Sequence, residues 1–453
     1  MSSRGSVQAA EQSQSADVLV AGGGMAGIAA AVSAARAGAD VLLVERGATL
    51  GGIATAGLNC SFMGVDRSVL GGIIWEVLDR LAALEGAIEG VYTPFDPEVF
   101  KTVALEMVTE AGVRLLLHSW LLEAVTRRGR VTGVKFVTKA GIRKIAAQAF
   151  VDATGDGDLA ASAGAPFESG RADGRPGQPM TVMLRMGNVD TRKLIAYTKE
   201  HPDQLYQNPL KCVLEERRDP PLFLFSGFFD LIRRAKEAGE LYLERESMGL
   251  IGLPSKGQVL VNATRVHGMD ATDPDGLTKA EVEARRQAWS VVRFLRRHMP
   301  GFGEAHLIDT AASIGVRESR RVKGQYMLTR EDILGEARFP DAVARNFFPM
   351  DIHGPADNPL SHTWLTLRPG GFYEIPYRCL VPLQVKGVLV AGRCISATHE
   401  AHGSTRTMPC CLATGQAAGV AAAVAVREGK SPQELDPQLV RRELMQQKAI
   451  LGD

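Results

Sequence analysis

Short apolar runs and one helical pattern occupy the start of the chain. Residues 17–22 (DVLVAG) and 40–45 (DVLLVE) are apolar runs typical of buried strands. Between them, the alanine-rich stretch 25–37 ends at Gly38 and predicts a buried helix. A strand, a glycine turn, a helix and a second strand within about thirty residues form a βαβ unit, which predicts a parallel sheet.

The pattern then changes from helical to alternating. Residues 96–111 predict a helix with Asp96 as its N-cap and Pro97 in its first turn, followed by a strand at 113–119. Residues 130–154 alternate between apolar and polar positions, with glycine turns at 133 and 141. This alternation predicts an antiparallel meander that leads into a buried strand at 149–153.

The middle of the chain, residues 165–374, has a mixed pattern. A helix is expected at 278–298, with Thr278 and Glu281 in capping-box spacing. Its expected apolar stripe and its arginine-rich face consist of Val282, Ala288, Trp289, Val292, Leu295 and Met299, and of Arg285, Arg286, Arg293, Arg296 and Arg297. We interpret the arginines as a solvated face, with a phosphate or RNA contact as the alternative.

Buried patterns return after residue 375. The run 386–392 (KGVLVAG) predicts a strand, and 409–427 predicts a helix of small residues. We therefore expect an α/β fold in which 17–164 and 375–453 form one layered domain. Residues 165–374 would form an inserted α+β substrate domain, and residues 1–16 a disordered tail.

Charge and cysteine content exclude several classes of protein. The net charge is +1, so nothing draws the chain globally toward nucleic acid or an anionic membrane. The six cysteines form no CxxC pair and the polar N-terminus is not a secretory signal, which favours the cytoplasm. Residues 18–35 and 407–426 lack charge over membrane-like lengths, but their alanine and glycine content favours buried helices. We expect a small-molecule partner, no membrane and no nucleic acid, with a homodimer possible.

The glycine turn at residues 22–27 carries the main chemical signal. Gly22, Gly24 and Gly27 match G-x-G-x-x-G after a strand and before a helix, and Glu45 ends the next strand. Gly22 would make the tight turn, Gly24 would admit a pyrophosphate, and Gly27 would let the helix lie close to the strand. The helix N-terminus would bind the phosphates, and Glu45 the ribose diol. The remaining candidates beside these residues are Met25, Ala26 and Arg46.

The motif alone does not separate NAD from FAD. A second glycine pair, Gly51–Gly52, follows the second strand and suits FAD, whose second half must run past the chain. No second glycine-rich unit for a separate nicotinamide nucleotide is evident in the sequence. FAD is therefore the expected cofactor.

Four blocks of the chain resemble a known family. They are 17–57, 151–166 (VDATGDGDLAASAGAP), 315–328 (GVRESRRVKGQYML) and 373–423, and they resemble FAD-dependent oxidoreductases of the glutathione-reductase-like superfamily, near fumarate reductase and ketosteroid dehydrogenase flavoproteins. The resemblance implies a glutathione-reductase-type Rossmann domain. It also implies that Val125 brackets the adenine. Further contacts would come from Ala153, Thr154 and Gly155 to the adenosine, from Gly392 and Arg393 to the ribityl chain, and from Thr55 and Ala56 to the flavin ring.

Residues 397–411 (ATHEAHGSTRTMPCC) are expected to form a loop that lines the flavin ring. The following helix would begin near Pro409 and direct its N-terminus at the ring. His402 or His399 would take a proton from substrate, with hydrogen bonding within the loop as the alternative role. The sequence H-E-x-H is not HExxH, and the glycine and serine after it favour a loop, so we expect no metal. Cys410 and Cys411 are interpreted as buried thiols rather than a redox pair.

Further pocket candidates lie in the third block and in the loop. Arg317, Arg320 and Arg406 would orient an anionic group, and Tyr326 would transfer a proton. The alternative for the arginines is an internal ion pair with Glu318 or Glu400, and Asn262 and Arg265 are weaker candidates. We expect an FAD-dependent dehydrogenase or oxidase that moves hydride from a substrate C–H to the flavin. A monooxygenase or double-bond reductase using NAD(P)H, and a non-catalytic or RNA-associated flavoprotein, are the alternatives.

Overall fold

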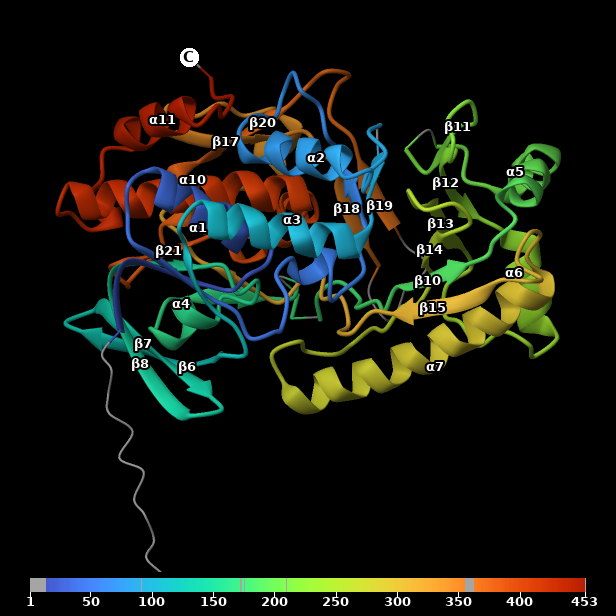
Figure 1. Ribbon diagram of the computed structural model, residues 1–453, viewed down its shortest axis with the longest axis horizontal. Helices are drawn as coiled ribbons and strands as arrows, with labels where there is room; N and C mark the ends of the chain where they lie inside the picture. Colours follow the sequence, from blue (N-terminus) through green and yellow to red (C-terminus); the bar gives the residue numbers. More distant parts are fainter. Residues whose placement is uncertain are drawn as a thin grey trace, which may run out of the picture.

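The computed structural model describes residues 14–452 except 91, 172, 175, 209 and 355–361. The molecule has two sheets side by side (Figure 1), the first together with α1 and α10 on the left and the second with α5–α7 on the right. The expected tail boundary at residue 16 is wrong, because strand β1 (Gln14–Ala21) already pairs with residues 145–147 from its first residue. Residues 1–13 of that expected tail lie outside the described residues.

The first sheet is parallel where the chain ends meet and antiparallel at one side. It contains seven strands in the order β5-β2-β1-β8-β7-β6, with β21 paired to β8. Besides β1 these are β2 (Val41–Val44), β5 (Arg114–Leu116), β6 (Trp120–Arg127), β7 (Arg130–Thr138), β8 (Gly141–Asp152) and β21 (Val388–Val390). The pairs β1–β2, β1–β8, β2–β5 and β21–β8 are parallel, as a βαβ unit requires. Both chain ends therefore contribute strands to one sheet.

Two helices of small residues pack together against this sheet. Helix α1 (Met25–Arg36) and helix α10 (Met408–Arg427) approach closely because α10 has glycines at the contact. A Cβ atom at Gly415 would lie 2.2 Å from the carbonyl oxygen of Ala26, and one at Gly419 would lie 2.1 Å from that of Ala30. Helix α10 is apolar and long enough to span a membrane by composition, but 89% of that window is buried inside the protein. It is a core helix of the fold.

The second sheet is antiparallel, with six strands in the order β11-β12-β13-β14-β10-β15. They are β10 (Leu184–Gly187), β11 (Cys212–Glu215), β12 (Leu222–Gly227), β13 (Met248–Gly252), β14 (Val259–Asn262) and β15 (His306–Thr310). Helices α5 (Thr191–Glu200), α6 (Phe229–Glu237) and α7 (Pro274–His298) accompany it, with the long α7 running along its lower side in Figure 1. All six strands fall within the expected insertion.

Helix α7 begins earlier than expected. Its N-cap is Asp273, whose side chain accepts hydrogen bonds from the amides of Asp275 and Gly276, whereas Thr278 bonds back to the carbonyl of Pro274 inside the helix. The expected stripe is also partly wrong, because Val282 and Trp289 are more than half exposed. The buried face is Gly276, Ala280, Ala284, Gln287, Ala288, Ser290, Val291, Val292, Phe294 and Leu295. The five arginines are exposed, as the solvated-face interpretation requires.

Small strand pairs and short helices connect the two sheets. The remaining strands are β3 (Ser61–Met63), β4 (Tyr92–Pro94), β9 (Phe167–Ser169), β16 (Arg320–Val322), β17 (Ala342–Asn346), β18 (Met350–His353), β19 (His362–Leu365) and β20 (Tyr373–Pro376). The remaining α-helices are α2 (Ile73–Ala83), α3 (Pro97–Glu110), α4 (Asp158–Ser162), α8 (Arg330–Leu334), α9 (His399–Thr405) and α11 (Pro437–Gln446). The 3-10 helices are Gly52–Ala54, Pro202–Gln204, Tyr377–Leu380, Gly392–Cys394 and Pro432–Glu434. Asp96 caps α3 with Pro97 in its first turn, as predicted.

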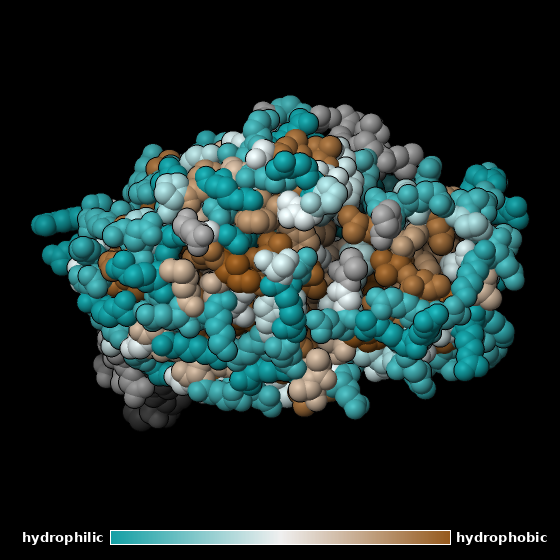
Figure 2. Space-filling model, turned by 90° about the horizontal axis from the view of Figure 1, so that it is seen from above, coloured by the Kyte–Doolittle hydropathy of each residue, from teal (hydrophilic) through white to brown (hydrophobic). Residues whose placement is uncertain are grey.

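Seen from above, hydrophilic residues cover most of the surface (Figure 2). Apolar residues show mainly in the middle of this face and toward the side that carries the second sheet. The fold is a mixed α/β fold with a parallel-strand sheet, as the alternation of strands and helices near the chain ends predicted.

Candidate functional site

A large cavity lies between the carboxyl ends of the first sheet's parallel strands and the second sheet. Its volume is about 830 Å³, and residues from both sheets line it. Parallel α/β sheets bind ligands at this edge, because the loops that follow the strands converge there. The cavity has a first half, built around the glycine turn, and a second half, which faces the second sheet and the β18–β19 hairpin.

The glycine turn opens the first half of the cavity. Gly22 has φ +99° and Gly27 lies against it, since a Cβ at Gly27 would come within 1.7 Å of the Gly22 carbonyl oxygen. Gly24 is different, because it caps α1 and a Cβ there would meet no atom within 4 Å. Two glycines are therefore required by packing, and Gly24 leaves open space at a helix N-terminus, where a phosphate binds favourably.

Glu45 is tied to the glycine turn. Its carboxylate accepts a 2.6 Å hydrogen bond from the amide of Gly23 and a 2.7 Å bond from that of Gly47. Arg46 follows it and lies 5.3 Å from the ring of Trp120, and all three side chains line the cavity. Gly51 also bonds to the turn, through its amide and the carbonyl of Gly23 at 2.8 Å. These contacts fix an acidic group and a stacked arginine beside the phosphate-sized space.

An ion pair between Arg393 and Asp156 lines this half of the cavity. Arg393 Nη2 lies 2.7 Å from Asp156 Oδ1, and Ser319 Oγ lies 2.6 Å from the same oxygen. Burial opposes the charge on Asp156, but Arg393 and Ser319 outweigh it and lower the pKa of this carboxyl. Gly155 has φ +81°, and a Cβ there would meet Arg393 Nη2 at 2.9 Å. Arg393 is thus held against the loop after β8.

The structure brings most of the expected cofactor residues to the cavity wall. Those that line it are Gly22, Gly24, Met25, Ala26, Glu45, Arg46, Gly52, Ala56, Ala153, Thr154, Gly155, Gly392 and Arg393. The residues Gly27, Gly51, Thr55, Val125 and Pro409 do not line it. Their contacts are with the protein itself: Thr55 Oγ1, for example, donates to the Leu50 carbonyl at 2.8 Å, and Val125 lies in β6 opposite Gly133.

The expected loop at 397–411 is wrong, because it folds into a short helix followed by a second helix. Thr398 caps α9, and α10 begins at Met408 with Pro409 in its first turn. Gly403 lies inside α9 against β18, where a Cβ would come 3.0 Å from the Asp351 carbonyl oxygen. Cys410 and Cys411 are free and buried as interpreted, and burial raises the pKa of Cys411 to about 12.

Neither histidine of this stretch lines the cavity. His399 Nδ1 lies 2.9 Å from Glu318 Oε1, and His402 Nε2 donates to the carbonyl of Arg393 at 3.0 Å. Burial, partly offset by Glu318, lowers the pKa of His402 to about 3, so the ring is neutral. The geometry gives no support to the expected role of either ring as the proton acceptor from substrate, and it matches the alternative of hydrogen bonding within the protein.

The four other expected catalytic residues separate into two groups. Arg317 and Arg406 line the second half of the cavity. Arg320 instead pairs with Asp158 at 2.8 Å, and the Tyr326 hydroxyl donates to Asp332 at 3.0 Å, both outside the cavity wall. Burial and then Asp332 raise the pKa of Tyr326 to about 12. Arg320 and Tyr326 thus have structural partners.

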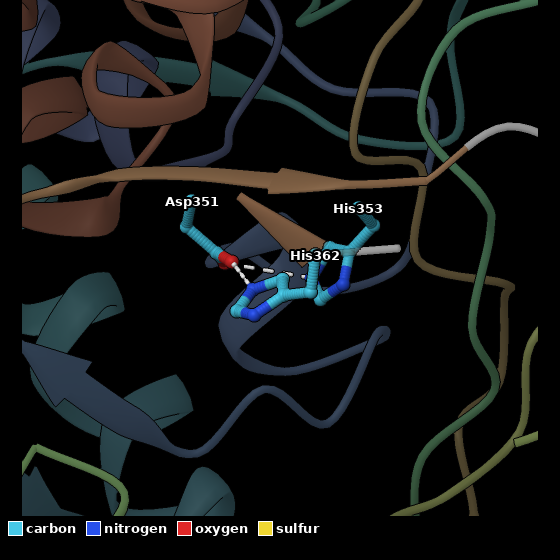
Figure 3. Close-up of side chains that lie close together, drawn as sticks. All are labelled: Asp351, His353 and His362. Atoms are coloured by element: carbon cyan, nitrogen blue, oxygen red, sulfur yellow. Dashed lines mark hydrogen bonds and ion pairs between the residues drawn. The ribbon is translucent and has the colours of Figure 1, made fainter. Parts of the chain in front are cut away.

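A cluster of one carboxylate and two imidazoles lines the second half of the cavity (Figure 3). Asp351 and His353 alternate on β18, so they share a face, and His362 on β19 lies directly opposite His353. His362 Nε2 lies 2.6 Å from Asp351 Oδ1, and the two rings stack with centroids 4.9 Å apart. Sequence analysis missed this cluster, although the D-x-H spacing on a strand was a signal for it.

The Nδ1 atoms of the two imidazoles are the outer nitrogens of this cluster, and their partners indicate where the ring hydrogens lie. Lys211 Nζ is 2.9 Å from His362 Nδ1, and Arg265 Nη2 is 3.0 Å from His353 Nδ1. Arginine only donates and the ionised Asp351 only accepts, so both Nδ1 atoms accept and both Nε2 atoms carry hydrogen toward Asp351. The three side chains are close enough to share an ion. An ion on Nε2, however, would displace the hydrogens that Asp351 accepts and would turn an Nδ1–H of His353 against Arg265, the opposite of the usual support for a metal-bound imidazole.

Cations outnumber carboxylates in this half of the cavity. We call Arg245, Arg265, Arg317 and Arg406 the cationic wall, and Lys211 lies beside them; among the described residues, only Asp351 and the exposed Glu246 line this half with opposite charge. Arg406 Nη2 pairs with Asp351 Oδ2 at 3.0 Å. Burial and then the neighbouring Arg265 lower the pKa of Arg245 to about 9. Burial, then Arg406 and Arg265, lower the pKa of Arg317 well below its usual value.

A family model and one curated relative match the sequence. The model, described as FAD dependent oxidoreductase, matches residues 17–444. Digeranylgeranylglycerophospholipid reductase 2 of Methanopyrus kandleri is 31% identical over 152 residues, which cover 31% of this chain and 37% of the relative. The matched segment therefore spans little more than a third of that relative's length.

Solved flavoprotein structures resemble the fold at low identity. A geranylgeranyl bacteriochlorophyll reductase-like protein of Thermoplasma acidophilum has a TM-score of 0.48 and 15% identity, covering 96% of this chain and 83% of that one. The p-nitrophenol 4-monooxygenase of Pseudomonas putida has a TM-score of 0.48 and 12% identity, with coverages of 95% and 84%. Neither likeness is high enough to transfer a substrate or a reaction to this chain.

Proposed function

Because this chain belongs to the FAD-dependent oxidoreductase family, we propose that it oxidises a small anionic organic molecule bound in the second half of the cavity. The chain is an enzyme and a flavoprotein. The alternative of a non-catalytic flavoprotein is therefore excluded. The proposal concerns the substrate class and the direction of electron transfer. The observation that carries it is the cationic wall.

The first half of the cavity fits FAD. Gly24 leaves room at the N-terminus of α1 for a pyrophosphate, and Glu45 would meet a ribose diol while the amides of Gly23 and Gly47 hold it. Gly392 and Arg393 would lie along the ribityl chain of FAD, on the way to the second half of the cavity. Bound FAD supplies an acceptor for two electrons, delivered as one hydride. The finer glutathione-reductase-type arrangement of the domain is part of this proposal.

The cationic wall would bind and orient the substrate's anionic group. Among the described residues, four arginines face two carboxylates here, and burial makes the excess positive charge costly, so that a bound carboxylate or phosphate would relieve it. Arg245 is the best placed to contribute, since its Nη1 bonds only weakly to Asn262, at 3.2 Å to both Asn262 oxygens. An anion held there would fix the rest of the substrate between this wall and the flavin.

Anaerobic reduction of the bound flavin tests the proposal. The purified holoenzyme is mixed with 2-hydroxy acids, amino acids and sugar phosphates, and with neutral alcohol and amine analogues, while the flavin absorbance is followed. We expect bleaching by members of the anionic set. In Arg245→Gln, KM for the reacting anion should rise about 10–100-fold, the size of one lost charge-assisted hydrogen bond. The exposed Arg293→Gln variant is the matched control.

Two other results would redirect the proposal. Fast flavin reduction by NADPH, without any anionic donor, would favour the monooxygenase or double-bond reductase alternative. Reduction by neutral analogues at the same rate as by the anions would contradict the anionic substrate class. A cytoplasmic location, a small-molecule partner and no nucleic acid or membrane partner complete the proposal, and gel filtration would test a homodimer.

A further inference from the structure

Lys211 presents its amine to the second half of the cavity. It lines the wall just before β11, and its Nζ lies 4.5 Å from the ring centroid of Tyr206 and 5.5 Å from that of Trp364. Its described hydrogen bond is with His362 Nδ1 at 2.9 Å. No carboxylate among the described residues forms an ion pair with this lysine.

A fixed chain of groups continues behind this amine. His362 Nε2 donates to Asp351 Oδ1 at 2.6 Å. This bond holds the imidazole in the tautomer whose Nδ1, facing Lys211, carries no hydrogen. Asp351 is held in turn by Arg406 at 3.0 Å from Oδ2 and faces His353 at 3.5 Å. Burial opposes its charge, but His353, His362 and Arg406 together keep the pKa of Asp351 well below its usual value. The order of the chain is therefore amine, imidazole, carboxylate.

The charges around Lys211 disfavour its ammonium form. Burial lowers its pKa, Asp351 opposes this effect, and Arg245 and Arg265 add to the lowering. Cys212 and the rings of Tyr206 and Trp364 complete its surroundings. A neutral lysine amine is a proton acceptor, which distinguishes Lys211 from the four arginines of the cationic wall.

We propose that Lys211 Nζ is the group that takes the substrate's proton, with His362 and Asp351 as its positioning residues. This inference rests on the proposed function. The O–H or N–H bond of the substrate breaks and an N–H bond forms on Lys211. The neighbouring C–H bond would break, its hydrogen and electron pair would leave as a hydride, for which bound FAD would supply the acceptor, and a C=O or C=N bond would form. The proton can pass on to His362 Nδ1 as Nε2–H moves toward Asp351.

The amine itself can be tested without knowing the substrate. Pyridoxal 5′-phosphate is an anionic aldehyde that forms an imine only with a neutral amine, and borohydride makes the link permanent. We label the holoenzyme between pH 6 and 10 and locate the lysines by mass spectrometry. Lys211 should be labelled with a midpoint at least one pH unit below that of the exposed Lys256. An equal midpoint for the two lysines would overturn the proposal.

Variants separate proton transfer from anion binding. Lys211→Arg carries a fixed positive charge and cannot accept a proton, and Lys211→Met has neither a charge nor a proton acceptor. With the anionic donors found in the anaerobic screen, both variants should reduce flavin about 10²–10⁴-fold more slowly. Their KM should stay within about threefold, and the wild-type pH dependence of the rate should be lost. A normal rate in Lys211→Arg, or a change in KM alone, would show a binding role and overturn the proposal.

Two controls keep the result interpretable. Lys256→Met should behave as wild type, and bound flavin absorbance in each variant reports the fold. His362→Gln retains a donor toward Asp351 but cannot relay a proton; because burial and both arginines remain, Lys211 should keep a labelling midpoint below that of Lys256 while flavin reduction slows. If no anionic donor bleaches the flavin, the proposed function fails, while the labelling midpoint still decides whether Lys211 is a neutral amine.

Discussion

The backbone amide of Gly23 donates a 2.6 Å hydrogen bond to the carboxylate of Glu45, so the end of β2 is fastened to the glycine turn. Because Gly47 donates to the other oxygen at 2.7 Å, Glu45 shapes the turn as well as facing the cavity. In Glu45→Gln, one of these two backbone N–H groups would face the side-chain NH₂ of the glutamine instead of an oxygen. We therefore expect FAD affinity to fall roughly 10-fold or more. Fluorescence titration of the apoprotein measures it. Exposed Glu106→Gln is the control, and unchanged affinity in Glu45→Gln would contradict the assignment.

Replacement of two motif glycines should have different effects. Gly24→Ala adds a Cβ with no atom within 4 Å, so the apoprotein should keep its melting temperature while FAD affinity drops at least 10-fold. Gly27→Ala places a Cβ 1.7 Å from a carbonyl oxygen and should lower stability of the apoprotein by several kcal/mol. Gly303→Ala, which also meets no atom within 4 Å, controls for glycine replacement. Normal FAD binding in Gly24→Ala would show that no ligand approaches this turn.

His402 should make the fold sensitive to acid. Its folded pKa is about 3 because it is buried, so the unfolded chain, with a usual value near 6.5, takes up this proton first as pH falls. The stabilisation is complete above about pH 6.5 and is lost as pH falls toward 3, by about 2 kcal/mol between pH 6.5 and 5.

Urea unfolding at these two pH values measures the effect. His402→Gln, which keeps a donor for the Arg393 carbonyl, should flatten the profile by about one proton, whereas the exposed His306→Gln should not. Flavin reduction should survive in His402→Gln. A complete loss of reduction with bound FAD retained would restore this histidine as a catalytic candidate.

The cluster of Asp351, His353 and His362 should not retain a divalent ion. Asp351 accepts from His362 Nε2 and Arg265 donates to His353 Nδ1, and these two bonds fix hydrogen on the nitrogens that an ion would need. We expect the holoenzyme, exposed to Zn²⁺ and desalted, to carry no stoichiometric metal by elemental analysis. One equivalent of zinc that disappears in Asp351→Asn would show that the imidazoles turn over to bind metal.

Local patterns were sufficient to predict the strand, the glycine turn and the helix that build the first half of the cavity. The strand, glycine turn and helix of residues 17–37 are adjacent in sequence, and so is Glu45, so period and spacing were sufficient to place them at one sheet edge. The pairing of β21 with β8 was also predictable from the sequence. A continuous apolar run is typical of a parallel strand, and such a strand has few other places to pair.

Patterns that depend on distant partners were not predictable in the same way. Gly403 and Ser404 suggested a loop, but Gly403 is required for close approach to β18, and Ser404 Oγ lies 2.7 Å from the Tyr373 hydroxyl. The pairing of β18 with β19 brings His362 to Asp351, and neither strand alone reveals it. The start of α7 was available in principle, since Asp273–Pro274 repeats the Asp96–Pro97 signal that located α3.

The close fit of α10 against α1 has a consequence for biosynthesis. Gly415 and Gly419 touch a helix made almost four hundred residues earlier, and Met408 and Cys411 of the same late helix line the cavity. During translation, the N-terminal glycine turn leaves the ribosome long before this wall exists. Full enclosure of the cofactor therefore has to wait until nearly the whole chain has been made, so a nascent chain stalled before α10 would expose the apolar face of α1 and its flavin site together.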